Sequence, residues 1–298
     1  MSYAYFPGCS AQGTGRSYEE SMLAVFGALD VGVEEIQDWN CCGASAYQAM
    51  DSAQALALAA RNLALAEDAR PGDDPIDVVA ACAGCYRNLV KTERALLEGS
   101  ADAERVHRAL LSVGLKSEQR ARTRHPLEVL VNDVGLDRIA GAVVRPLEGV
   151  RVVCYYGCLL VRPDSSFDDS RAPTSMERLM QATGAQALDW PLRTRCCGGS
   201  CYCGGPLIGG LPDATLKLSH QLLQDARNRG ADVIVTVCPL CQFNLEAFQG
   251  HMARTFCEPV DITVGFFTQL LGLALGLDER TLGLHRMLRW RLPAAAGK

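Results

Sequence analysis

The chain has 298 residues, of which 48% are hydrophobic, and carries a formal net charge of −5 at pH 7. This length suffices for two domains, and the acidic balance without a long basic run argues against nucleic acid as the main partner. The first residues, MSYAYFPGCS, lack a basic and apolar signal segment, and the longest apolar stretch, residues 264–277, is too short to cross a bilayer. We therefore expect a cytoplasmic protein without a membrane span, in which residues 264–277 form a buried helix.

The first part of the chain alternates short apolar runs with helical patterns. A strand is expected at residues 2–6, a helix at 16–29, a short strand at 33–39 and an alanine-rich helix at 51–69. A buried strand at 76–82 then leads into a further helix. Each strand runs toward a cysteine motif: Cys9 after the first, Cys41 and Cys42 after the second, and Cys82 and Cys85 after the third.

The second part repeats this order after a connection, residues 101–149, that we expect to be helical and without a strand. Strands are expected at 150–156, 185–190 and 231–238, with helices at 174–183 and 213–229. The cysteines recur in the same places, as Cys158, as the pair Cys196 and Cys197, and as Cys238 and Cys241. We expect domains at residues 1–100 and 150–298, related by a pseudo-twofold axis.

The spacing of the cysteines makes the repeat hard to ascribe to chance. Between the first cysteine and the adjacent pair lie 31 residues in one half and 37 in the other, and 39 and 40 residues then precede the CxxC motif. Strands that alternate with helices predict an α/β fold with small parallel sheets flanked by helices. The cysteines would lie at the carboxyl ends of the strands, where such folds place their sites.

Fourteen cysteines in a chain of this kind indicate metal or redox chemistry rather than disulfides. Four thiolates would satisfy a structural zinc ion or a cubane iron–sulfur cluster, but each half offers five. Because the side chains of adjacent cysteines diverge, Cys41 and Cys42 are poorly placed to chelate one ion together. The sequence favours a polynuclear, thiolate-rich site, with a pair of zinc sites or buried thiols as the alternative.

The doubled pattern resembles the cysteine-rich CCG domain family, and most closely the B-type subunits of heterodisulfide reductases. The resemblance runs from YFPGCS at residue 5 to the apolar C-terminal segment and includes YYGCLLVRP at residues 155–163. It implies one non-cubane 4Fe–4S cluster per motif. The implied ligands of the two clusters are Cys9, Cys41, Cys42, Cys82 and Cys85, and Cys158, Cys196, Cys197, Cys238 and Cys241.

Several residues outside this pattern are open to two interpretations. Cys201 and Cys203 could be catalytic thiols or loop packing, whereas Cys154 and Cys257 are expected to be structural. Arg162, Arg193 and Arg195 could bind an anionic substrate or could be solvated surface arginines. His220 is a candidate proton donor, and no glycine-rich flavin or NAD fingerprint is present.

The resemblance implies an oxidoreductase component that cleaves or forms a disulfide or a carrier-bound sulfur species, with two clusters facing a shared cavity. Implied partners are a C-type iron–sulfur subunit, a flavin-bearing A-type subunit and a lipoate-carrying protein. One alternative is a CCG electron-transfer subunit of a quinone-linked dehydrogenase. The absence of a C-x₂-C-x₂-C-x₃-C-P run argues against this alternative, because such relatives often carry a fused ferredoxin domain. A zinc-stabilised scaffold without catalytic activity is the third hypothesis.

Overall fold

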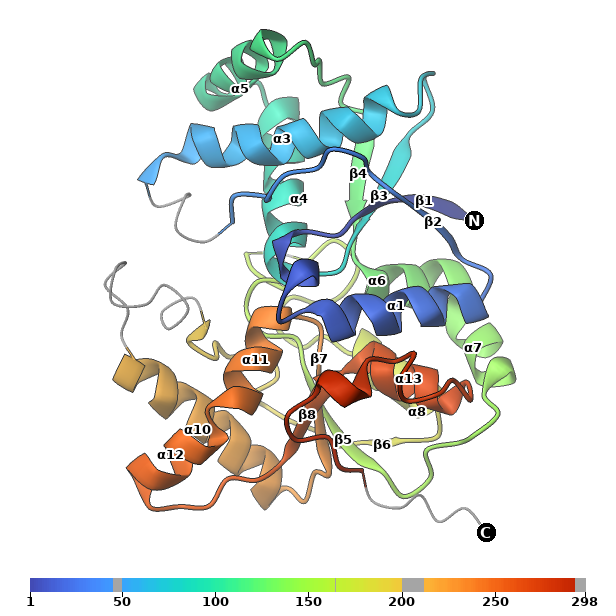
Figure 1. Cartoon of the computed structure of the whole chain (residues 1–298), viewed down its shortest axis with the longest axis vertical. Coiled ribbons are helices and arrows are strands. Elements are labelled where there is room, and N and C mark those ends of the chain that lie inside the picture. The colour runs from blue at the N-terminus through green and yellow to red at the C-terminus, as the bar shows by residue number, and fades with distance from the viewer. Residues whose placement is uncertain (45–49, 164, 200–211, 293–298) are drawn as a thin grey trace. The chain divides into compact units, whose positions relative to one another are not determined.

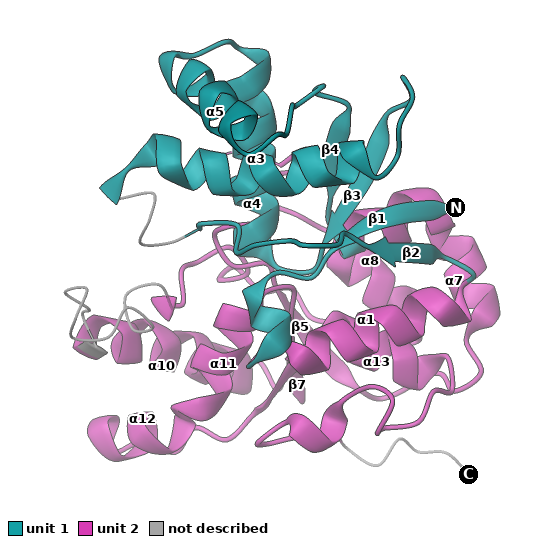
Figure 2. Cartoon of the chain, turned by 45° about the horizontal axis from the view of Figure 1, so that its top comes forward, with its two compact units in different colours: residues 1–13, 30–126 teal, residues 14–29, 127–298 magenta. Residues whose placement is uncertain are grey.

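A computed structural model describes residues 1–44, 50–163, 165–199 and 212–292 (Figure 1). Contacts between residues divide the chain into two compact units (Figure 2). The first comprises residues 1–13 and 30–126, and the second comprises residues 14–29 and 127–298.

The first unit is built on a four-stranded parallel sheet in the order β2-β1-β3-β4. In register, Ser2 pairs with Gly32, Ala4 with Val78, and Ile76 with Ala121. Helices α3 and α4 pack on the sheet, and α5 packs on α3. The elements are β1 (Ser2–Phe6), η1 (Cys9–Gln12), β2 (Gly32–Glu35), α3 (Ser52–Asp68), β3 (Ile76–Ala80), α4 (Ala83–Leu97), α5 (Ala101–Ser112) and β4 (Ala121–Arg124).

The second unit has the same design, with a parallel sheet in the order β6-β5-β7-β8. Figure 1 shows α10, α11 and α12 on one side of β7 and β8, and α1, α8 and α13 on the other. The elements are α1 (Arg16–Ala28), α6 (Pro126–Glu128), the π-helix η2 (Val129–Gly135), α7 (Leu136–Ala142), β5 (Arg151–Tyr155), α8 (Ser175–Ala182), β6 (Gln186–Ala187), α10 (Pro212–Asn228), β7 (Val233–Thr236), α11 (Pro239–Ala247), α12 (Gln249–Phe256), β8 (Thr263–Phe266), α13 (Phe267–Ala274) and η4 (Leu284–Arg286).

The structure confirms the expected α/β class with two parallel sheets, but corrects two segments. The connection that we expected to be helical contains strand β4, whose sequence ARTR hides its strand character. Its buried Arg124 is neutralised by Asp77 at 3.1 Å. The apolar stretch that we expected to be one helix begins as strand β8, because a fully buried strand of four residues has the same apolar composition as a helix. The domain boundaries at residues 100 and 150 stay a prediction.

Helix α1 precedes most of the first unit in the sequence but belongs to the second. Its Tyr18 ring stacks on Phe266 with ring centroids 4.5 Å apart, and Ser21 Oγ lies 2.6 Å from Thr268 Oγ1. Glu20 accepts hydrogen bonds from the Arg286 guanidinium at 2.8 and 2.9 Å. No helix among the described residues is long and apolar enough to cross a membrane.

Candidate metal centres

The cysteines of the repeat follow the carboxyl ends of the strands, as expected. Cys9 comes three residues after β1, and Cys158 comes three residues after β5. Cys82 and Cys238 are the N-cap residues of α4 and α11, and both have extended backbone angles. Cys85 and Cys241 therefore lie in the first turn of a helix, where the helix dipole and unpaired N–H groups favour thiolates.

In the first unit, the structure brings the five cysteines into one group. Cys42 Sγ lies 3.3 Å from Cys85 Sγ, and Cys41 Sγ lies 3.9 Å from Cys9 Sγ. Cys82 interacts electrostatically with both Cys9 and Cys85, which links the two pairs. We call these five residues the first cysteine group.

The second unit contains an equivalent group, which we call the second cysteine group. Cys197 Sγ lies 3.5 Å from Cys241 Sγ, matching the pair of Cys42 and Cys85. Cys158 interacts with Cys196, Cys197 and Cys238. None of the twelve described cysteines forms a disulfide, so the thiols of both groups are available as ligands.

Glycines allow the backbone to approach these sulfurs. Gly8 and Gly157, which precede the first cysteine of each group, have φ of 71° and 67°. A Cβ atom on Gly8 would lie 2.9 Å from Cys85 Sγ, and one on Gly157 would lie 3.2 Å from Cys241 Sγ. Both glycines are thus required for their positive φ and for the space that they leave to a buried sulfur.

Each group has an exposed and a buried part. Cys9, Cys41 and Cys196 are exposed, whereas Cys42, Cys85, Cys197, Cys238 and Cys241 are buried. A cavity of about 390 Å³ opens beside the exposed part of the first group. It is lined by Cys9, Gln12, Cys41 and residues 35–40, so two thiols of this group can be reached from solvent.

Hydrogen bonds between neighbouring thiols set the ionisation of each group. Bonds from Cys42 and Cys9 lower the pKa of Cys41 to about 2, while the bond to Cys41 raises the pKa of Cys9. In the second group, the bond from Cys158 lowers the pKa of Cys196 to about 6, with a smaller contribution from Arg162. Each group thus holds a thiolate near neutral pH, the form that binds metal.

Backbone amides also point at the sulfurs. Gly198 N–H donates to Cys196 Sγ, and Gly199 N–H donates to Cys197 Sγ, both at 3.3 Å. Among the described residues, no three His, Cys, Asp or Glu side chains are grouped so as to hold a single metal ion. Soft thiolates with N–H donors to sulfur suit a polynuclear iron–sulfur group.

Sequence reasoning missed an asparagine in each half. Asn88 lies three residues after Cys85, and Asn244 lies three residues after Cys241. The Asn88 side-chain amide donates to the Cys42 carbonyl, and Asn244 Nδ2 donates to the Cys197 carbonyl at 2.8 Å. The signal was present in the sequence, because both halves read CxxCxxN.

The three candidate arginines lie in different surroundings. Arg193 is engaged on all sides, since its guanidinium donates to Glu177, Asp189 and two backbone carbonyls. Its carbonyl oxygen accepts from the N–H groups of Tyr156 and Gly157 and thereby holds the approach to Cys158. Arg162 and Arg195 are exposed, which leaves them more available to an anion than Arg193.

The remaining candidates are placed as follows. Cys154 is fully buried in β5, and burial raises the pKa of its thiol, whereas Cys257 is exposed at the end of α12. The His220 ring lies against Phe256, with Nε2 3.4 Å from Glu258 Oε2. Cys201 and Cys203 lie outside the described residues.

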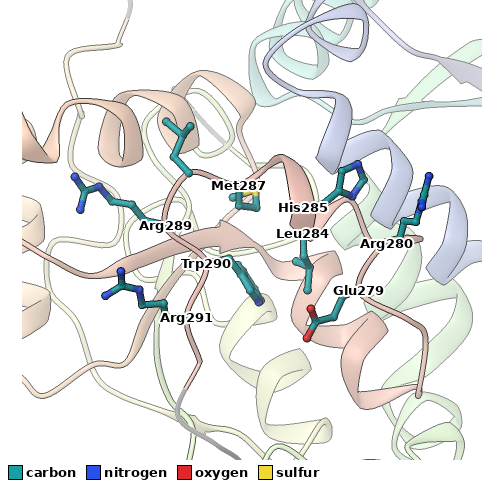
Figure 3. A pocket seen from close by; sticks show the side chains of 9 residues that line it. Glu279, Arg280, Leu284, His285, Met287, Arg289, Trp290 and Arg291 are labelled. Carbon is teal, nitrogen blue, oxygen red and sulfur yellow. The ribbon is translucent and has the colours of Figure 1, made fainter.

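A second cavity, of about 660 Å³, is formed by the C-terminal segment of the second unit, residues 279–291 (Figure 3). Trp290 packs on strand β8, where a Cβ on Gly265 would lie 2.4 Å from its ring. Arg289 and Arg291 extend together on the other side of the segment, within 3.3 and 3.9 Å of Asp261. No cysteine lines this cavity.

Comparison with known proteins supports the doubled architecture. The model of the cysteine-rich CCG domain matches residues 3–90 and 152–246, which contain all ten cysteines of the two groups. The chain is also similar to the crystal structure of a hypothetical protein from Helicobacter pylori, with a TM-score of 0.77 and 15% identity. That similarity covers 97% of this chain and 52% of the other, and it shows the fold alone.

Curated relatives are components of two kinds of reductase. The chain is 30% identical over 285 residues to the 8-methylmenaquinol:fumarate reductase membrane anchor subunit of Wolinella succinogenes, covering 95% of both chains. It is 29% identical to the B-type subunit of the ferredoxin/F(420)H(2)-dependent CoB-CoM heterodisulfide reductase of Methanosarcina acetivorans, covering 94% of this chain and 91% of the other. It is 28% identical to a protein of Archaeoglobus profundus that is named as similar to the same heterodisulfide reductase component, covering 95% and 94%. With two matches to the domain and relatives along its whole length, the chain belongs to the cysteine-rich CCG domain family.

Proposed function

We propose that the chain is the iron–sulfur subunit of a heterodisulfide reductase-like complex and that it cleaves or forms a disulfide or a carrier-bound sulfur species. The observation that carries this proposal is the matched pair of cysteine groups, each with one close sulfur pair, at 3.3 Å and 3.5 Å. The relatives named for the B-type component of heterodisulfide reductase support it over nearly the full length of the chain.

Each cysteine group is proposed to hold one non-cubane 4Fe–4S cluster. The five thiols of a group exceed the four that a cubane needs, and the adjacent cysteines project in different directions and can reach different irons. The ligands would be Cys9, Cys41, Cys42, Cys82 and Cys85 in the first unit, and Cys158, Cys196, Cys197, Cys238 and Cys241 in the second. Bound clusters would supply the electron transfer that thiol chemistry at these groups requires.

The proposed reaction, written as a reduction, is R–S–S–R′ + 2e⁻ + 2H⁺ → RSH + R′SH. The chain's part is to expose the Cys9 and Cys41 edge to the first cavity and to keep Cys42 and Cys85 away from water. Electrons would come from a C-type iron–sulfur subunit and a flavin-bearing A-type subunit. A lipoate-carrying protein would present bound sulfur if the reaction runs as an oxidation.

The test is an iron and sulfide count on anaerobically purified protein, with EPR recorded before and after addition of a thiol. The proposal predicts about eight irons per chain, from two four-iron clusters, and an EPR signal that changes when thiol is added. A colourless protein that contains zinc would support the scaffold hypothesis and overturn this one.

A second candidate function is an electron-transfer subunit of a quinol-linked reductase, which the Wolinella relative favours. The missing ferredoxin run does not argue against this function, because the chain covers 95% of that relative. The two functions are separated by mixing the reduced protein with either a disulfide or a water-soluble quinone. Faster reoxidation by the disulfide supports the first function, and faster reoxidation by the quinone supports the second.

A further inference from the structure

The two asparagines, Asn88 and Asn244, occupy equivalent positions in the two units. Each lies one helical turn after the second cysteine of its CxxC motif, on the same face of the helix as that cysteine. Each is 1% exposed, and each donates its amide N–H to the carbonyl of the second cysteine of the adjacent pair. The same contact, formed twice in sheets of the same order, points to a common role.

The carbonyl that each asparagine holds belongs to a constrained peptide. It joins Cys42 to Gly43 in the first unit and Cys197 to Gly198 in the second, and these glycines have φ of 74° and 76°. The orientation of this peptide fixes the direction of the preceding Cα–Cβ bond and therefore the position of the cysteine sulfur. That sulfur lies 3.3 Å or 3.5 Å from the sulfur on the asparagine's own helix.

We propose that Asn88 and Asn244 are positioning residues, each of which ties the Cys–Gly peptide to the CxxC helix and so holds two buried cysteine ligands of one cluster in register. The role of the ligands rests on the proposed function, whereas the contact itself does not. The asparagines touch a ligand's backbone rather than its sulfur, and they act through that ligand.

The chemistry of the amide suits this role. The carbonyl needs a donor, and a neutral amide supplies one without adding charge beside thiolates. An aspartate of the same shape would only accept hydrogen bonds when ionised, and it would repel both the carbonyl and the thiolates. A leucine would fill the space without donating, which would leave the buried carbonyl without this partner.

The two units differ in how many side chains support this peptide. In the second unit, Ser219 Oγ also donates to the Cys197 carbonyl at 2.9 Å, and Thr215 Oγ1 donates to the Gly198 carbonyl at 2.9 Å. In the first unit, α3 places Ala55 against Gly43, and Ala59 follows one turn later where α10 has Ser219. Neither alanine can donate from its side chain, so the first group should depend more on its asparagine.

The experiment compares Asn88→Asp and Asn88→Leu with Asn244→Asp and Asn244→Leu in the full chain, purified anaerobically. Iron per chain, the EPR spectrum and the thermal transition are measured, and alkylation by iodoacetamide followed by mass spectrometry shows which thiols have been released. Gln249→Glu is the matched control. Gln249 is fully buried and also donates to backbone carbonyls, those of Leu245 and Ile262, but none of these residues is a cysteine.

Both Asn88 variants should lose at least half of the first group's iron and release its thiols, while the second group stays protected. The Asn244 variants should keep most of their iron and show a shifted EPR signal. Iron and spectra no different from those of Gln249→Glu would overturn the proposal, as would thiol release from both groups in proportion to unfolding. Wild-type protein without iron would instead refute the proposed function.

Discussion

Four glycines border cysteines of the two groups, and all four have positive φ: Gly8, Gly43, Gly157 and Gly198. A Cβ on Gly43 would lie 3.2 Å from the Ala55 carbonyl, and one on Gly198 would lie 2.8 Å from Thr215 Cα. The glycines of the CCG motifs thus allow α3 and α10 to pack against the backbone of the adjacent cysteines. The conformation and the close contact both require glycine, which explains why the motif includes it.

Gly8→Ala should damage the first cysteine group specifically. The new Cβ would lie 2.9 Å from Cys85 Sγ, so this buried sulfur has to move. The matched control is Gly99→Ala, because Gly99 has φ of 64° and a Cβ there would meet nothing within 4 Å. Both variants should lose about 1 kcal/mol of unfolding free energy to the positive φ, measured by urea denaturation.

Only Gly8→Ala should also lose iron, by up to half of the total, as measured by iron analysis. Equal iron content in the two variants would show that the first group tolerates movement of Cys85.

At the scale of elements, each cysteine group is assembled where strands end and helices begin. β3 leads directly into the N-cap Cys82, and β7 leads into the N-cap Cys238. The strand fixes the position of the cap, and the helix that follows carries the second cysteine of the motif and, one turn later, the asparagine. One strand–helix junction thus positions two thiols and one amide.

The sequence predicted the three strands nearest to the cysteines in each sheet, because each precedes a recognisable motif. It missed the fourth strand in both sheets, β4 and β8, which lie at the sheet edges and lead to no cysteine. β4 is charged, and β8 merges with the apolar helix α13. The grouping of the cysteines followed from the repeat, whereas the asparagine contacts depend on tertiary packing that spacing alone does not show.

The contact between α4 and β4 should make stability depend on pH. Glu93 of α4 accepts a hydrogen bond from Thr123 N–H of β4 at 2.8 Å, and burial raises the pKa of its carboxyl to about 7. Because this pKa exceeds that of the unfolded chain, 4.5, the folded state binds the proton more tightly. The resulting stability is fully present below pH 4.5 and is lost as the pH rises through 7.

Glu93→Gln should remove this dependence, because glutamine can accept the same bond without ionising. The expected flattening is up to about 3 kcal/mol of unfolding free energy, measured by urea denaturation between pH 5 and pH 8. Glu98→Gln, at the exposed end of the same helix, should retain the wild-type profile. A wild-type profile in Glu93→Gln as well would assign the pH dependence to other groups.

At the scale of the whole molecule, the two sets of five cysteines are divided between the two compact units. Every cysteine of the first group lies within residues 1–13 and 30–126, and every cysteine of the second lies within residues 127–298. Helix α1 is the exception to a simple division of the chain, since it lies between Cys9 and Cys41 in sequence but packs on α13 of the second unit. The cysteines follow the repeat, although the chain as a whole does not.

This division predicts that the two groups lose their iron independently. Cys42→Ala should remove about half of the iron, and Cys197→Ala the other half, because each change deletes one buried ligand of one group. Metal binding and folding are coupled in thiolate sites, so each variant should also unfold at a lower temperature than the wild type. Cys257→Ala is the control, since this exposed cysteine lies in neither group, and its iron content should equal that of the wild type. Iron analysis, with EPR to identify the remaining signal, checks the result. If either single substitution removed iron from both groups, the groups would form one interdependent centre, and the assignment of five ligands to each unit would be wrong.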